Sequence, residues 1–211
     1  MSECLAAWFL AERLSMVVSP RPKGQAAHIL EMAIELPGGH INVEVKAPHR
    51  PFPLTTQAGD DSDALRAVIK SANEQFARHE KNLLVIIPRL PVFFFEEPWA
   101  LQRLVALKAF VIEETLRVAI DPATGGPAGA VYIAMRPSGE FVKPRGAKAR
   151  RFTRTGGALL INEHVGMPMR YSAMLIHNPC ALNRLPKDLW NGVDQFCEAD
   201  GQWAWRSSEC A

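Results

Sequence analysis

The chain of 211 residues lacks long hydrophobic runs and any strong excess of one charge. Its longest apolar stretches, Leu83–Ile87 and Val92–Phe95, are far shorter than the roughly 20 residues that a membrane-spanning helix needs. The 24 basic and 22 acidic residues leave a net charge of +2, which by itself does not indicate a nucleic-acid partner. We therefore expect no membrane association, and an argument for nucleic acid has to come from local charge.

Cysteine is scarce, and no C-x-x-C pair occurs among the four residues Cys4, Cys180, Cys197 and Cys210. The first residues do not resemble a secretory signal, because Glu3 precedes their apolar stretch and two charged residues follow it closely. Without such a signal, we interpret the cysteines as free thiols and expect a cytoplasmic protein. His177 and Cys180 could begin a zinc site, but no second pair at ligand spacing follows.

Several catalytic motifs are absent as well. The sequence has no G-x-S-x-G, no Walker loop and no G-x-G-x-x-G, so acyl transfer, nucleotide hydrolysis and dinucleotide chemistry have no support. What remains is a chain long enough for a substantial core, which predicts one domain or one domain with an appendage. We place a nuclease-like core at residues 1–120 and a β-rich extension at 121–211, with the extension as a candidate part of the same domain.

The first half of the chain predicts an α/β order. A helix is expected from Ser2 to about Met16, followed by a short strand at Met16–Val18. Two alternating runs, Ala27–Leu36 and His40–Lys46, predict a β-hairpin, although the helical period also fits the first run. The remaining predicted elements are a helix from Asp60 to Phe76, a strand at Leu83–Ile87, a helix from Pro98 to about Val118, strands at Ala130–Met135, Ala158–Ile161 and Tyr171–Ile176, a short helix near Lys187–Phe196, and a final strand at Gln202–Trp205.

The third predicted strand carries the tripeptide Glu44-Val45-Lys46, which places Glu44 and Lys46 on one strand face. A hairpin precedes this face, and an amphipathic helix with Gln75 follows it. On these residues, positions 3–90 resemble the αβββαβ core of the restriction-endonuclease-like superfamily, the PD-(D/E)xK nucleases. The resemblance implies a Mg²⁺ or Mn²⁺ site, with Glu44 as a metal ligand, Lys46 at the attacking water or phosphate, and Gln75 near the same site.

The second predicted strand departs from the family pattern because it lacks the expected Asp. Glu31 is the candidate replacement as second metal ligand, His28 is a weaker one, and Glu12 is a candidate extra carboxylate on the first helix. A two-residue type I′ turn at Gly38-Gly39 would pair Glu31 with Lys46 and put Glu31 within about 6 Å of Glu44. A surface ion pair between Glu31 and Lys46 is the alternative. A three-residue turn would mix apolar and charged side chains on each face.

A basic segment follows in the second half of the chain. Seven cations lie among nineteen residues that contain one acid, Glu140, and such clusters suit phosphate binding. Prolines and glycines within the segment predict a flexible loop, whose alternative role is a solvated surface. The cations are Arg136, Lys143, Arg145, Lys148, Arg150, Arg151 and Arg154.

The leading hypothesis is a Mg²⁺-dependent phosphodiesterase, a hydrolase that acts on nucleic acid, with DNA as the expected substrate. The alternative is an inactive relative of the same fold that binds nucleic acid or a protein partner. A structural subunit of a larger assembly, including a homo-oligomer, is a third hypothesis.

Overall fold

The computed structural model of the chain describes residues 2–20, 32–47, 62–87, 110–114, 148–164 and 170–208. Their helices and strands are α1 (Ser2–Trp8), the π-helical turn η1 (Phe9–Arg13), β1 (Val18–Pro20), β2 (Met32–Leu36), β3 (Gly39–Lys46), α2 (Ser62–Gln75), β4 (Lys81–Ile86), β5 (Val111–Glu114), β6 (Lys148–Arg151), β7 (Gly157–His164), β8 (Arg170–His177), β9 (Asp194–Ala199) and β10 (Gln202–Arg206). The expected α/β class is confirmed, and so is the order helix, three strands, helix, strand up to β4.

The chain divides into two compact units. The first consists of Met1–Phe110 with Phe152–Ala211, and the second of Val111–Arg151. Strands β7 to β10 continue the sheet that β1 to β4 begin, so most of the predicted β-rich extension belongs to the first unit. The second unit contains the antiparallel pair β5–β6.

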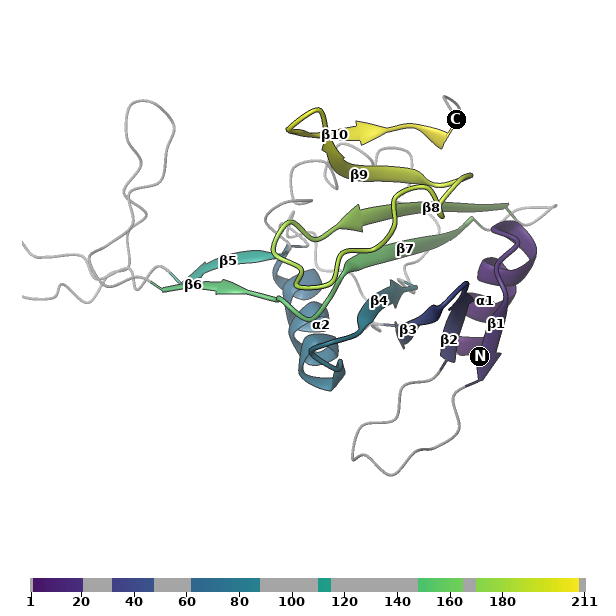
Figure 1. Cartoon of the computed structure of the whole chain (residues 1–211), viewed down its shortest axis with the longest axis horizontal. Helices are drawn as coiled ribbons and strands as arrows, with labels where there is room; N and C mark the ends of the chain where they lie inside the picture. The colour runs from purple at the N-terminus through teal and green to yellow at the C-terminus, as the bar shows by residue number, and fades with distance from the viewer. Residues whose placement is uncertain are drawn as a thin grey trace, which may run out of the picture. The chain divides into compact units, whose positions relative to one another are not determined.

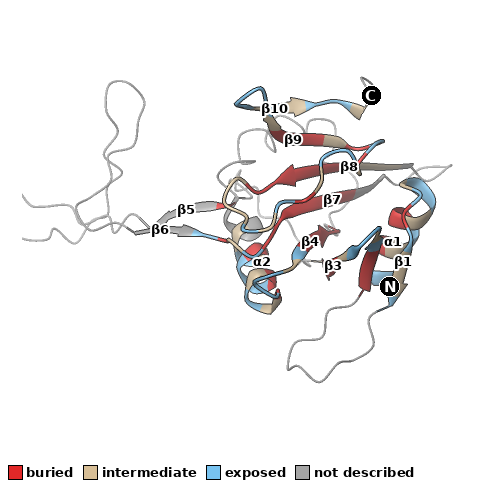
Figure 2. Ribbon diagram, viewed as in Figure 1, coloured by how far each residue is buried: buried red, intermediate tan, exposed pale blue. Residues whose placement is uncertain are grey.

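A mixed sheet of eight strands forms the first unit, in the order β1-β2-β3-β4-β7-β8-β9-β10 (Figure 1). Strand β3 runs parallel to β4, and β4 runs parallel to β7. A parallel pair needs a crossover connection, and α2 lies in the connection from β3 to β4. Buried residues concentrate in the middle strands β3, β4, β7 and β8, as expected for strands with neighbours on both edges (Figure 2).

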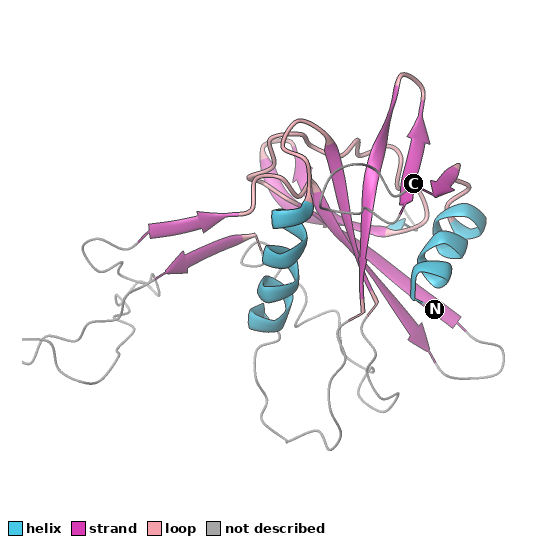
Figure 3. Cartoon of the chain, turned by 90° about the horizontal axis from the view of Figure 1, so that it is seen from below, coloured by secondary structure: helices cyan, strands magenta, loops and turns pink. Residues whose placement is uncertain are grey.

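The two helices lie on opposite faces of this sheet (Figure 3). Val43 and Val45 pack in one apolar cluster with Phe9 and Leu10 of the first helical segment. Lys46 alternates with Val45 along β3 and contacts α2 instead. Strand β3 is therefore buried on both faces, with an apolar side under α1 and a polar side under α2.

The predicted hairpin is confirmed, but its turn differs from the prediction. Leu36 pairs with Gly39, so the turn residues are Pro37 and Gly38 rather than Gly38 and Gly39. Only Gly38 has a positive φ, of 79°, and proline cannot adopt one, which is the combination of a type II turn. The shift of two residues keeps every side chain on its predicted face, so Ala33 still shares a face with Asn42.

Two predicted helices are wrong where the structure describes them. Val111–Glu114 forms strand β5 inside the helix expected from Pro98 to Val118, and its β-branched start favours a strand. The helix expected near Lys187–Phe196 is a turn followed by β9. The expected strand at Ala130–Met135 lies outside the described residues.

Candidate functional site

Glu44 is a buried carboxylate in the middle of the sheet. It lies on the α2 side of β3, opposite Leu84 of β4, and the residue is 3% exposed. Its Oε1 accepts a hydrogen bond of 2.6 Å from Lys46 Nζ. Its Oε2 has no hydrogen-bond partner among the described residues. Carboxylates with buried unpaired oxygens are costly in a fold, which makes this oxygen a candidate ligand atom.

Lys46 joins this carboxylate to the helix above it. Its Nζ also lies 3.4 Å from Oε1 of Gln75, at the long end of the range for a hydrogen bond. The side chain of Lys46 is 27% exposed, whereas that of Glu44 is 4% exposed. The structure thus brings together all three residues that the sequence predicts as catalytic.

The local sequence explains this arrangement. Positions two apart on a strand share a face, so the E-x-K spacing aligns Glu44 with Lys46. Gln75 is the last residue of α2, next to Phe76, which anchors that end of the helix in the core. The anchor sets the height of Gln75 above the sheet, where its amide reaches the ammonium group of Lys46.

The predicted second ligand, Glu31, lies outside the described residues, so its distance to Glu44 stays a prediction. Glu12 lies in η1 and is exposed to solvent. In the described ranges, no group of three or more His, Cys, Asp or Glu side chains gathers at one point. The donors at hand fit one part of a magnesium site, because the free carboxylate oxygen of Glu44 is a hard ligand.

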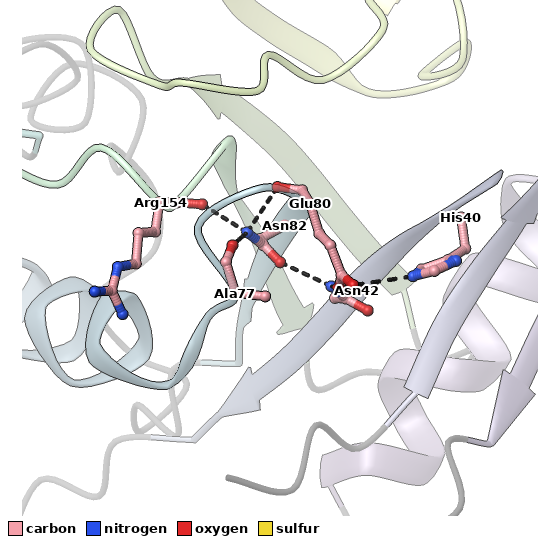
Figure 4. A network of polar contacts seen from close by, with 6 residues as sticks. All are labelled: His40, Asn42, Ala77, Glu80, Asn82 and Arg154. Carbon is pink, nitrogen blue, oxygen red and sulfur yellow. Dashed lines mark hydrogen bonds and ion pairs between the residues drawn. The ribbon is translucent and has the colours of Figure 1, made fainter. Parts of the chain in front are cut away.

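A buried polar network holds the neighbouring part of β3 (Figure 4). Asn42 and Asn82 face each other in the register of β3 and β4, both are fully buried, and Asn42 Nδ2 donates to Asn82 Oδ1 over 2.9 Å. Asn42 Nδ2 also donates to the carboxylate of Glu80, and Nε2 of His40 lies 3.8 Å from the same oxygen. This network specifies the register between the two strands, since a shift would leave buried amides unpaired.

Asn82 is the centre of that network. Its Nδ2 shares its two hydrogens among the backbone carbonyls of Ala77 at 2.8 Å, Glu80 at 2.9 Å and Arg154 at 2.8 Å. Gly156 N in turn donates to the carbonyl of Asn82 over 2.8 Å. A Cβ at Gly156 would lie 2.8 Å from that carbonyl oxygen, so the close approach needs glycine. One side chain therefore links the turn after α2, the start of β4 and the segment before β7.

The basic residues do not form the single loop that the sequence suggested. Lys148, Arg150 and Arg151 belong to β6, which pairs with β5. Arg154 is exposed, and its guanidinium donates to the carbonyl of Phe76 over 3.3 Å. Arg136, Lys143 and Arg145 lie outside the described residues. Lys148–Arg151 forms a strand because it pairs with β5, and the composition of the segment does not indicate this pairing.

Other polar residues outside the predicted site have structural partners. Asn73 Oδ1 accepts from the backbone N–H groups of Arg154 at 2.9 Å and Thr155 at 3.3 Å. Asn178 Nδ2 donates to the carbonyls of Phe152 and Thr155, both at 2.6 Å. A signal existed for Asn42 and Asn82, because asparagine is unusual beside apolar runs in predicted strands.

His177 is a buried histidine at the end of β8. Its Nε2 lies 2.9 Å from Oε1 of Gln195 on β9, and Gln195 Nε2 donates to the carbonyl of Trp190. Because that amide already donates through its nitrogen, its oxygen accepts the Nε2 proton of His177. Burial lowers the pKa of His177 below its usual 6.5, the hydrogen bond to Gln195 opposes this change, and the charge of Lys187 adds to it.

No helix in the described part of the chain is long and apolar enough to cross a membrane. No protein-family model, curated protein or solved structure matches this chain.

Proposed function

We propose that the chain is a divalent-metal-dependent phosphodiesterase that hydrolyses nucleic acid, with DNA as the expected substrate. The observation that carries the proposal is the buried carboxylate of Glu44, which has one oxygen on Lys46 and one oxygen without a partner among the described residues. An apolar core has no use for such a group. A catalytic site that needs one ligand oxygen and one nearby cation would use this carboxylate.

Each of the three residues has a distinct role in this proposal. Glu44 would hold Mg²⁺ or Mn²⁺ through Oε2, and a bound ion would supply Lewis-acid chemistry for the water and the phosphate. Lys46 presents its ammonium group to the scissile phosphate or the attacking water. Gln75 restrains Lys46 through its side-chain oxygen. Glu31 remains the expected second ligand.

A catalytically inactive nuclease-like module is the second candidate. The ion pair between Lys46 and Glu44 favours it, because it neutralises the buried carboxylate without any metal. No group of three or more His, Cys, Asp or Glu side chains suited to a metal occurs among the described residues, which points the same way. Such a module would bind nucleic acid or a protein partner through other surfaces.

Cleavage assays separate the two candidates. The purified full chain is incubated with plasmid and with single- and double-stranded oligonucleotides, in Mg²⁺ or Mn²⁺ and then in chelator. We expect cleavage that requires the metal and is abolished by Glu44→Gln and by Lys46→Ala. Glu35→Gln is the matched control, since Glu35 lies on the same face of the hairpin and is exposed.

The control variant should cleave as the wild type does. Undiminished cleavage by Glu44→Gln or by Lys46→Ala would remove that residue from the mechanism. If the wild type cleaves no substrate with either metal, the binding-module candidate replaces the enzyme.

A further inference from the structure

Lys46 occupies the carboxylate that the proposed function assigns to a metal. Its Nζ lies 2.6 Å from Glu44 Oε1, and the Glu44 side chain is 4% exposed. A carboxylate removed from water to this extent is strongly unfavourable without a positive partner. Lys46 supplies that positive charge, so the ion pair stabilises the site when no divalent cation is bound.

The ion pair between Lys46 and Glu44 can also be broken. An ammonium group has three donors, and those of Lys46 reach one oxygen of Glu44 and, at 3.4 Å, one oxygen of Gln75. Its side chain is 27% exposed, so solvent reaches part of this side chain. A phosphate group that approaches from solvent can therefore accept a hydrogen bond from Lys46 and draw it away from Glu44.

A divalent cation and Lys46 oppose each other at Glu44. A cation bound to Oε2 would share one carboxylate with the ammonium group on Oε1, and two positive charges a few ångströms apart repel each other strongly at a poorly solvated position. Removal of Lys46 from Oε1 ends this repulsion and frees a second ligand oxygen. The departure of Lys46 from Glu44 thus makes binding of the cation more favourable, and binding of the cation makes the departure of Lys46 more favourable.

We propose that Lys46 couples metal binding to substrate binding. While its ammonium group is paired with Glu44, it weakens metal binding there, and this effect ends when Lys46 binds a backbone phosphate of the nucleic acid instead. The proposal rests on the proposed function and adds a regulation to the same site. Because coupling is reciprocal, the metal also strengthens phosphate binding by the same factor. The enzyme then assembles its metal centre mainly on nucleic acid, which limits binding of metal by the free protein.

The test measures Mn²⁺ affinity of the full chain by calorimetry, with no cleavage readout. Lys46→Met removes the charge and keeps most of the side-chain length, and we expect it to bind Mn²⁺ about tenfold more tightly than the wild type without nucleic acid, within the usual size of such couplings. Lys46→Arg keeps the charge and should bind no more tightly than the wild type. Glu44→Gln should lose the site.

A second arm uses the wild type alone, so it does not depend on the folding of any variant. A phosphorothioate duplex, whose backbone is anionic, should raise the Mn²⁺ affinity of the wild type about tenfold after correction for metal bound by the duplex itself. A methylphosphonate duplex, whose backbone is uncharged, should not. Lys46→Met should show no increase with either duplex, because the coupling residue is missing.

The outcomes distinguish a failure of the coupling from a failure of the proposed function. If Glu44→Gln loses Mn²⁺ binding but Lys46→Met binds no more tightly than the wild type, the coupling is wrong and the metal centre stands. An anionic duplex that leaves wild-type affinity unchanged overturns the coupling in the same way. If Glu44→Gln binds Mn²⁺ as the wild type does, the metal centre itself is wrong.

Discussion

At the scale of single residues, the chain contains a few polar side chains whose burial is chemically expensive. Glu44 is compensated by Lys46, and Asn42 by Asn82 and Glu80. The ring of His177 is hydrogen-bonded to Gln195, and burial lowers its pKa, which favours the neutral form. These three cases differ in purpose: a charge that the proposed function uses, an amide that sets register, and a ring that links two strands.

His177 should make the stability of the fold depend on pH. Its pKa in the folded protein is lowered below 6.5, mainly by burial, so the unfolded chain takes up its proton first as the pH falls. The free energy of unfolding should be at its full value above about pH 6.5 and should decrease below it, because protons favour the unfolded state there. Denaturant unfolding of the wild type and of His177→Gln from pH 8 to pH 5 measures this.

The variant should show a smaller loss of stability than the wild type over that range, since glutamine can still donate to Gln195 but does not titrate. His79→Gln is the control, because the ring of His79 is exposed to solvent. Equal pH dependence in the wild type and in His177→Gln would show that this histidine does not set the acid limit of the fold.

At the scale of elements, the site depends on how β3, α2 and β4 are fastened together. Asn42 and Asn82 set the register of the parallel strands, and through it the positions of Glu44 and Lys46. Asn82 also holds the turn that follows α2, whose last residue is Gln75. The same amide thus acts on both elements that carry the candidate site.

Removal of the Asn82 side chain should destabilise the fold severely. Asn82→Ala leaves three backbone carbonyls without their donor in a partly buried network and removes one acceptor of the Asn42 amide, which should lower the free energy of unfolding by about 3 kcal/mol. Asn183→Ala is a matched control, because the Asn183 side chain donates once, to the carbonyl of Arg78, at an exposed position.

Asn183→Ala should lower the free energy of unfolding by less than about 1 kcal/mol. Urea denaturation at neutral pH compares both variants with the wild type. If Asn82→Ala loses no more stability than Asn183→Ala, the network does not stabilise the packing of β3, α2 and β4.

At the scale of the whole molecule, the charge is divided unevenly between the two units. Val111–Arg151 holds seven of the 24 basic and four of the 22 acidic residues, so its net charge is +3 and that of the remaining chain is −1. The near-neutral total therefore conceals a positive segment inserted between β4 and β7. A local positive charge of this kind suits a phosphate backbone, which the proposed function requires.

Neutralising Arg150, Arg151 and Arg154 together should weaken nucleic-acid binding and reduce its dependence on salt. Each lost phosphate contact should reduce the slope of log affinity against log salt by about 0.9 on duplex DNA. The contribution of Arg154 should be the smallest, since its guanidinium already donates to the Phe76 carbonyl. Fluorescence anisotropy with a labelled duplex at several salt concentrations measures the slope.

Neutralising Arg184 and Lys187 provides the control, because both lie in the first unit on an exposed surface beside Glu198. That variant should keep the wild-type slope. An unchanged slope in the triple variant would assign the basic residues to a solvated surface and leave the substrate to be bound elsewhere.

Short-range patterns were sufficient for much of this structure. Alternation along His40–Lys46 predicted a strand with Glu44 and Lys46 on one face, and the amphipathic stripe predicted the helix that carries Gln75. These patterns succeed because strand and helix periods follow from backbone geometry alone. The same local reasoning failed at Val111–Glu114 and at the hairpin turn, where a strand partner and a proline decided the outcome.

Contacts between distant segments lie beyond such patterns. The distance from Lys46 to Gln75, the pairing of Asn42 with Asn82 and the free oxygen of Glu44 all depend on packing between elements that sequence spacing does not relate. Residue types alone therefore predicted which side chains could form a site. Only the folded sheet, with the polar face of β3 covered by α2, decided that Lys46 and not water would stabilise the buried carboxylate of Glu44, because burial removes the solvent that would otherwise hydrate it.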